Sequence, residues 1–149
     1  MRSIGFMVVL LLLAGCARDD VRLHGTWHSN RDATVAAAFE RDPRWKNASA
    51  ESKERFRNIY GHMTLTYSKG LVTSTYKGET GSFPYRVVRR GANDVVIRTG
   101  GGAIDLHRDI HIRFVEGGAA YWSDAGPDFF LGSSTLEKFD RVTVAQGVK

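Results

Sequence analysis

The sequence predicts a mainly β protein: an eight-stranded antiparallel up-and-down barrel with a two-helix insertion after the first strand. Glycine placement is the first observation, because none lies between Thr26 and Tyr60 whereas residues 61–132 hold twelve. The second is that these glycines separate short β-branched and aromatic runs at intervals of about ten residues, as in an antiparallel sheet. The third is the alternation of apolar and polar side chains along residues 103–116, which is typical of a strand with one buried face.

The chain begins with a segment typical of a secretory signal. Arg2 precedes an apolar run over residues 4–13, which is much shorter than the ~20 residues of a membrane-spanning helix. The run ends in Leu13-Ala14-Gly15-Cys16, which resembles the lipobox of bacterial lipoproteins, where the cysteine receives a diacylglycerol. A buried first strand, or a plain signal followed by a chance cysteine, is the alternative interpretation.

The lipobox resemblance implies a domain organisation and a location. Residues 1–15 would be a cleaved signal, residues 16–22 an acylated cysteine with a polar tether, and residues 23–149 the barrel domain. Acyl chains on Cys16 would anchor the protein without a spanning helix, since each buried methylene contributes ~0.8 kcal/mol. Ala17 stands where an aspartate favours inner-membrane retention, so the resemblance implies the outer membrane, facing the periplasm.

Cysteine usage also limits the chemistry. Cys16 is the only cysteine of the chain, which excludes an intramolecular disulfide and a zinc site of several thiolates. If it is acylated, it is not a nucleophile either.

The glycine-free stretch predicts two helices after a first strand at residues 23–29. Asn30 or Asp32 is suited to cap the first helix, which continues to Glu40 before Pro43 stops it. Ser49 is suited to cap the second helix, which we expect to end at Gly61 with Phe56, Ile59 and Tyr60 as its apolar stripe. The other strands are expected at residues 62–69, 71–78, 82–90, 94–99, 103–116, 119–124 and 135–144.

Eight such strands are sufficient to close a barrel, which leaves no sheet edge open to aggregation. Trp27 indicates which alternate residues of the first strand face inward. In the later strands, the alternate residues that are apolar are expected to face inward. The residues expected to face inward are Leu65, Tyr67, Tyr85, Val87, Val95, Ile97, Ile110, Ile112 and Phe114.

The order of these elements resembles a known family. Gly25-Thr26-Trp27 in the first strand, a helical segment, a run of short hairpins and Arg141 in the last strand are together similar to a lipocalin-like, calycin-type barrel. In that family the tryptophan packs near the closed barrel end beneath an arginine of the final strand. The resemblance therefore implies these structural roles for Trp27 and Arg141. The insertion after strand one is longer than in the family, whose main helix more usually follows the last strand.

The leading functional expectation is non-enzymatic binding of a small apolar or amphipathic ligand in the barrel. Tyr67, Tyr85 and Phe114 are the predicted contacts, because a buried tyrosine hydroxyl needs a polar partner that a ligand could supply. The insertion around Trp45 and Phe56 would then act as a lid over the mouth away from Trp27 and Arg141.

A protein-interaction module is the alternative function. It could be an envelope inhibitor, an immunity protein against a cell-wall enzyme, or an assembly accessory. Its hallmark would be exposed aromatic or charged residues in Tyr121-Trp122-Ser123-Asp124 or in Asp128-Phe129-Phe130.

His107, Asp109 and His111 share one face of the sixth strand and carry the only residue pattern that favours an enzyme or a metal site. Zinc prefers three or four protein ligands, so His24, His28 or His62 would have to converge on them. We expect instead a solvated outer face with local histidine–aspartate and arginine–aspartate contacts, without catalytic residue, metal or cofactor.

The formal net charge of +5 makes anionic partners plausible. Arginines recur in the sheet near aromatic residues, a combination that nucleic-acid-binding surfaces also show. Because an exported protein rarely meets nucleic acid, we expect lipid head groups, lipopolysaccharide or peptidoglycan carboxylates to be the available anions. The arginines concerned are Arg86, Arg89, Arg90, Arg98, Arg108 and Arg113.

Overall fold

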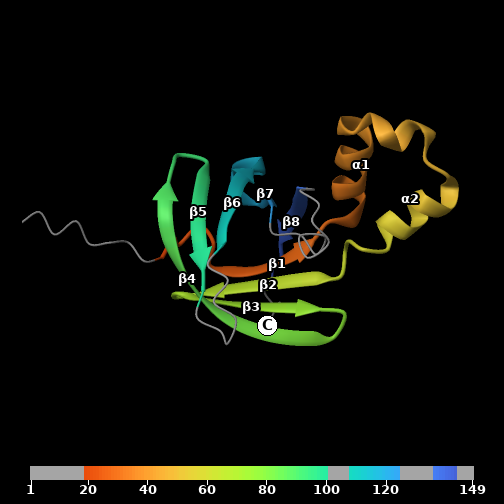
Figure 1. Cartoon of the computed structure of the whole chain (residues 1–149). Helices are drawn as coiled ribbons and strands as arrows, with labels where there is room; N and C mark the ends of the chain where they lie inside the picture. Colours follow the sequence, from red (N-terminus) through yellow and green to blue (C-terminus); the bar gives the residue numbers. More distant parts are fainter. Residues whose placement is uncertain (1–18, 101–107, 125–135, 144–149) are drawn as a thin grey trace, which may run out of the picture.

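A computed structural model describes residues 19–100, 108–124 and 136–143. Eight antiparallel strands close into a barrel in which each strand pairs with its neighbours along the chain and β8 returns to β1 (Figure 1). This confirms the predicted mainly β, up-and-down barrel with helices inserted after the first strand. The strands are β1 (Gly25–Ser29), β2 (Met63–Ser68), β3 (Leu71–Tyr76), β4 (Glu79–Arg90), β5 (Asp94–Thr99), β6 (Arg108–Val115), β7 (Ala120–Ser123) and β8 (Glu137–Arg141).

The two ends of the barrel differ in what lies against them. At one end, called here the closed end, the chain enters β1 and the β2–β3, β4–β5 and β6–β7 connections turn. Residues 19–24 lie at this end, and the fully buried Leu23 joins the barrel core from there. At the other, the helical end, β1 leads into α1 (Arg31–Arg41) and α2 (Ala50–Arg57) leads to β2 (Figure 1).

The barrel interior is a packed aromatic and aliphatic core. Trp27 is fully buried, and its ring centroid lies 4.6 Å from that of Tyr121 and 6.4 Å from that of Phe114. Most residues expected to face inward belong to this core, although Val87 and Ile110 are only partly buried. Each fully buried aliphatic side chain contributes about 1.5–3 kcal/mol, so this core accounts for much of the stability of the barrel.

A β-bulge in β4 changes which arginines face outward. The pairing of β4 with β5 shifts between Val87 and Arg89, which leaves Val88 on the surface with 38% of its area exposed. Arg89 then lies opposite Val96, whose other cross-strand neighbour is His111. The bulge thus brings Arg89 to the outer face beside His111, while Arg90 continues to the closed end.

The helical insertion has its own small aromatic core. Asn30 caps α1 by accepting a hydrogen bond from the Ala33 backbone N–H at 2.9 Å, and Ser49 caps α2 through the Ser52 N–H at 3.1 Å. Between the helices lies a 3₁₀ helix, Pro43–Asn47, which the sequence analysis did not predict. Four rings pack together in tilted pairs with centroids 4.5–5.6 Å apart, namely those of Phe39, Trp45, Phe56 and Tyr60.

Several element boundaries differ from the prediction. β1 begins at Gly25 rather than at residue 23 because residues 21–23 form a turn, and α2 ends at Arg57 rather than at Gly61. β4 begins at Glu79, since a tight turn with positive φ at Lys77 and Gly78 ends β3 early. Residues 103–107 of the predicted sixth strand lie outside the described residues. In the described part of the chain, no helix has the length and hydrophobicity needed to cross a membrane.

Candidate functional site

The three predicted ligand contacts lie at the closed end of the barrel. Tyr67 pairs with Gly25 at the start of β1. The Tyr85 hydroxyl donates a hydrogen bond to the Asp19 carboxylate, and the Arg22 guanidinium lies 4.9 Å from the centroid of the Phe114 ring. Residues of the chain itself therefore occupy polar and aromatic contacts that the sequence analysis assigned to a ligand.

Burial and hydrogen bonding govern the ionisation of Tyr67, Tyr85 and Asp19. Burial raises the pKa of Tyr67 to about 12, and together with the Asp19 carboxylate it raises the pKa of Tyr85 well above its ordinary value. Burial also raises the pKa of Asp19, but hydrogen bonds with Tyr85 and His24 outweigh it and the net shift is downward. At neutral pH both phenols are thus protonated, and Asp19 is an ionised acceptor for the Tyr85 hydroxyl.

Trp27 and Arg141 lie together at the closed end. The Arg141 guanidinium stands 4.2 Å from the centroid of the Trp27 ring and donates hydrogen bonds to the carbonyls of His24 at 2.7 Å and Arg22 at 2.6 Å. The indole N–H of Trp27 donates to the Leu23 carbonyl at 2.7 Å. These contacts tie residues 22–24 across the end of the barrel.

The polar tether expected at residues 16–22 is folded against the barrel from Asp19 onward. Asp20 is only 2% exposed, and its carboxylate lies 2.7 Å from Arg22 Nη2 and 2.9 Å from Arg90 Nε. The hydrogen bond from Arg22 lowers the pKa of Asp20. The sequence predicts a polar tether here but not this packing, because Arg90, a partner of Asp20, is remote in sequence.

The predicted lid does not face the predicted ligand contacts. The helical insertion belongs to the helical end (Figure 1), whereas Tyr67 and Tyr85 lie at the closed end. Trp45 and Phe56 pack on each other, with ring centroids 4.5 Å apart. α1 instead packs beside β8, where the fully buried Thr34 accepts a hydrogen bond from the Lys138 backbone N–H at 2.9 Å.

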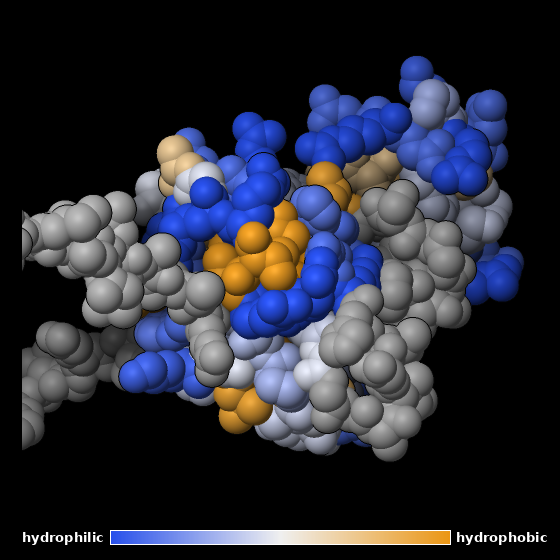
Figure 2. All heavy atoms as spheres, turned by 60° about the vertical axis from the view of Figure 1, so that its left-hand side comes forward, coloured by the Kyte–Doolittle hydropathy of each residue, from blue (hydrophilic) through white to orange (hydrophobic). Residues whose placement is uncertain are grey.

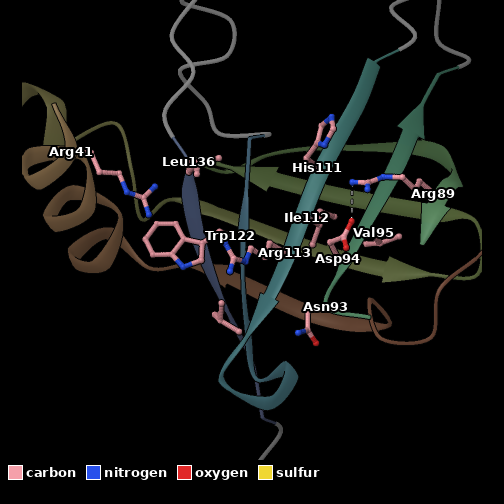
Figure 3. Close-up of a pocket in the computed structure, with 11 residues that line it drawn as sticks. Arg41, Arg89, Asn93, Asp94, Val95, His111, Ile112, Arg113, Trp122 and Leu136 are labelled. Atoms are coloured by element: carbon pink, nitrogen blue, oxygen red, sulfur yellow. Dashed lines mark ion pairs between the residues drawn. The ribbon is translucent and has the colours of Figure 1, made fainter. Parts of the chain in front are cut away.

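A groove on the outside of the barrel is the candidate site. It lies across β5, β6 and β7 beside the C-terminal end of α1 (Figure 3), and its volume is about 520 Å³. The β4 bulge and the end of α1 each bring an arginine to it. The lining residues are Arg41, Arg89, Asn93, Asp94, Val95, His111, Ile112, Arg113, Val115, Trp122 and Leu136.

Positive charge dominates the groove. Three of its lining residues are arginines, against the single carboxylate of Asp94, which pairs with Arg89 at 2.9 Å. The Arg41 guanidinium lies 5.5 Å from the Trp122 ring. Neither Arg41 nor Arg113 has an ion-pair partner among the described residues. The groove therefore offers two guanidinium groups to an anion.

The groove also has apolar parts. The half-buried Trp122 lies between Arg41 and Arg113 in the close-up (Figure 3), and Leu136 is 37% exposed. On the side of the barrel where β4 and β5 come forward, Figure 2 shows a compact hydrophobic area enclosed by hydrophilic side chains. A flat aromatic face beside guanidinium groups suits a ligand that combines an apolar body with an anionic head.

The histidine–aspartate strand does not assemble a metal site in the described residues. Asp109 accepts two hydrogen bonds from Arg98, at 2.6 and 2.8 Å, and this contact lowers its pKa. His111 lies at the groove, and His107 lies outside the described residues. Among the residues described, no three histidine, aspartate, glutamate or cysteine side chains are grouped to hold an ion.

Two features were missed by the sequence analysis. Arg41 belongs to the groove only because α1 packs beside β8, which no local pattern shows. The other is Glu137, fully buried in the barrel, whose carboxylate accepts a hydrogen bond from Ser29 Oγ. Glu137 lies two residues before the buried Phe139 and therefore faces the same side of β8, which was the signal for its burial.

Comparison with models of protein families gave no match for this chain, and comparison with curated proteins gave none either.

Proposed function

We propose that this protein is a lipid-anchored, non-enzymatic binding module of the bacterial envelope, which holds an amphipathic anion in the groove outside its barrel. The observation that carries the proposal is the position of Arg41 and Arg113 on either side of Trp122. The ligand class agrees with the amphipathic ligand expected from the sequence, but the site is moved from the barrel interior to its outer face.

The chemistry of the groove supports this ligand class. A guanidinium group presents paired N–H donors that match a carboxylate or a phosphate. The Trp122 ring supplies a rigid apolar face. A volume of about 520 Å³ lies within the range of roughly 300–1,000 Å³ that small-molecule sites occupy.

The location rests on the sequence around Cys16. The Leu13-Ala14-Gly15-Cys16 motif after a short apolar run supports acylation, and Ala17 supports the outer membrane with the domain facing the periplasm. Phosphorylated glycolipids, phospholipids and peptidoglycan carboxylates are the anions of that compartment, and each contains a group that guanidinium groups bind.

A protein partner is the second candidate. Trp122 belongs to the Tyr121–Asp124 segment that the interaction hypothesis singled out, and tryptophan and arginine are enriched among residues that dominate protein interfaces. Tyr121 is fully buried, however, so this segment offers Trp122 rather than two exposed rings. A small-molecule test separates the two candidates.

The test uses protein produced from Ala17 onward, which keeps every described residue, and the fluorescent anion 8-anilinonaphthalene-1-sulfonate. We expect saturable binding that weakens about tenfold in Arg41→Ala and in Arg113→Ala, since a hydrogen bond to a charged group contributes about 1.5–3 kcal/mol. The control is Arg55→Ala on the exposed face of α2, where the arginine pairs with Glu51.

A neutral analogue, N-phenyl-1-naphthylamine, tests whether charge selects the ligand. The proposal predicts weaker binding of this neutral probe and no dependence on Arg41 or Arg113. Equal affinity for both probes, or equal weakening in the Arg55→Ala control, would overturn the small-anion proposal and leave the protein-partner candidate.

A further inference from the structure

The short distance along the chain between the anchor and the barrel limits how the protein sits on a membrane. Asp19 is the first residue described, and three contacts fix it to the closed end. The Tyr85 hydroxyl donates to its carboxylate, His24 Nε2 lies 2.5 Å from the same group, and Arg90 Nη2 donates to its carbonyl at 2.5 Å. Tyr85 and Arg90, both in β4, therefore set its position relative to the barrel.

Asp19 lies three positions after Cys16, with only Ala17 and Arg18 between them. A fully extended chain advances at most ~3.6 Å per residue, so the acylated cysteine would lie within ~11 Å of the closed end. Strands of five or six residues, such as β1 and β2, are about 17–20 Å long. The helical end is thus too distant from Asp19 to be the end nearest the anchor.

The closed end carries side chains that suit a lipid surface. Val21 is 77% exposed within residues 19–24, Leu71 is 40% exposed at the start of β3, and Val142 is 45% exposed just after β8. Lys69, in the β2–β3 turn, is exposed and has no ion-pair partner among the described residues. Single apolar side chains combined with lysine are typical of peripheral contact with anionic head groups.

We propose that the closed end of the barrel docks on an anionic lipid surface, with Val21 and Leu71 at the level of the head groups and Lys69 beside lipid phosphates. This rests on the proposed acylation of Cys16, because the anchor holds the closed end at the membrane. The helical end, including α1 and Arg41 of the groove, then projects away from the lipid.

The test uses the mature, acylated protein in vesicles of phosphatidylethanolamine and phosphatidylglycerol. Because Cys16 is the only cysteine, one introduced cysteine is the only free thiol for a fluorescent label. Val21→Cys and Leu71→Cys report on the closed end. The matched control is Glu79→Cys, an exposed position at the β3–β4 turn of the helical end.

Quenching by lipids that carry a nitroxide at the head group then measures proximity. We expect at least about threefold stronger quenching at positions 21 and 71 than at position 79. Adding Lys69→Glu should weaken the quenching at positions 21 and 71. Equal quenching at all three positions in acylated protein overturns the orientation alone. Mass spectrometry of the same samples separates the two proposals, since an unmodified Cys16 overturns the anchor and the orientation with it.

Discussion

At the residue scale, Arg141 closes one end of the barrel by two kinds of contact. Its guanidinium lies over Trp27 and donates to two carbonyls of residues 22–24. Arg141→Lys keeps the charge but loses the planar fork, so the free energy of unfolding in urea should fall by about 1–2 kcal/mol. Arg55→Lys on exposed α2 should change it by less than about 0.5 kcal/mol. Equal effects of the two substitutions would show that residues 22–24 are not held by Arg141.

Asp20 makes the stability of the protein depend on pH. The pKa of Asp20 is lowered in the folded state from its ordinary value of 3.8. The carboxylate therefore stabilises the fold fully at pH values above 3.8, and this contribution is lost as the pH falls through the lower folded pKa. Asp20→Asn should cost about 2 kcal/mol at pH 7, because Arg22 and Arg90 lose their shared carboxylate.

Urea unfolding at pH 7, 5 and 3 measures this dependence. The difference between wild type and Asp20→Asn should be similar at pH 7 and 5 and should narrow toward pH 3. Asp32→Asn, on the exposed side of α1, is the control and should have a smaller effect. A constant difference across the three pH values would contradict the assignment of this ion pair.

At the scale of the elements, local pattern predicted the strands well and their irregularities poorly. Period-two alternation and glycine turns were sufficient for the eight strands because each depends on a few neighbouring residues. The β4 bulge was not foreseen, since Tyr85-Arg86-Val87-Val88-Arg89-Arg90 is compatible with either register beyond Val87. Only the pairing with β5 decides it, and that pairing brings Arg89 to the groove.

The candidate site was predicted only in its separate parts. Arg89, Arg113, His111 and Trp122 were each noted in the sequence, but their grouping depends on the barrel register and on the packing of α1 beside β8. Asp20 was assigned to a tether because its partner Arg90 is 70 residues away along the chain. Contacts at such separations leave no local signal.

The helical insertion has an aromatic core of its own. Phe56 contacts the rings of Trp45, Phe39 and Tyr60, so Phe56→Ala should cost about 2 kcal/mol, less than the 3–5 kcal/mol typical of a fully buried ring. Hydrogen exchange should quicken over residues 31–57 and stay unchanged in β5 and β6. The exposed Glu54→Ala is the matched control, and uniformly faster exchange in the barrel strands would show that the insertion unfolds with the barrel.

At the scale of the whole molecule, the anchor is expected to depend on one side chain. Cys16→Ser should remove the protein from the outer-membrane fraction and abolish the acyl mass, because a serine cannot form the thioether to diacylglycerol. Ala17→Ser is the control and should leave both unchanged. Retention of Cys16→Ser protein in the membrane, together with a wild-type chain that carries no acyl group by mass spectrometry, would refute the lipoprotein assignment.

We expect the outer groove, and not the barrel interior, to bind an amphipathic anion. Two-dimensional NMR of ¹⁵N-labelled protein from Ala17 onward, titrated with 8-anilinonaphthalene-1-sulfonate, distinguishes the two places. We expect saturable shifts of the amides of His111, Arg113 and Trp122, and of the Trp122 indole N–H, with the Trp27 indole N–H unchanged. Shifts centred on Tyr67, Tyr85 and the Trp27 indole would instead place the ligand inside the barrel and refute binding in the groove.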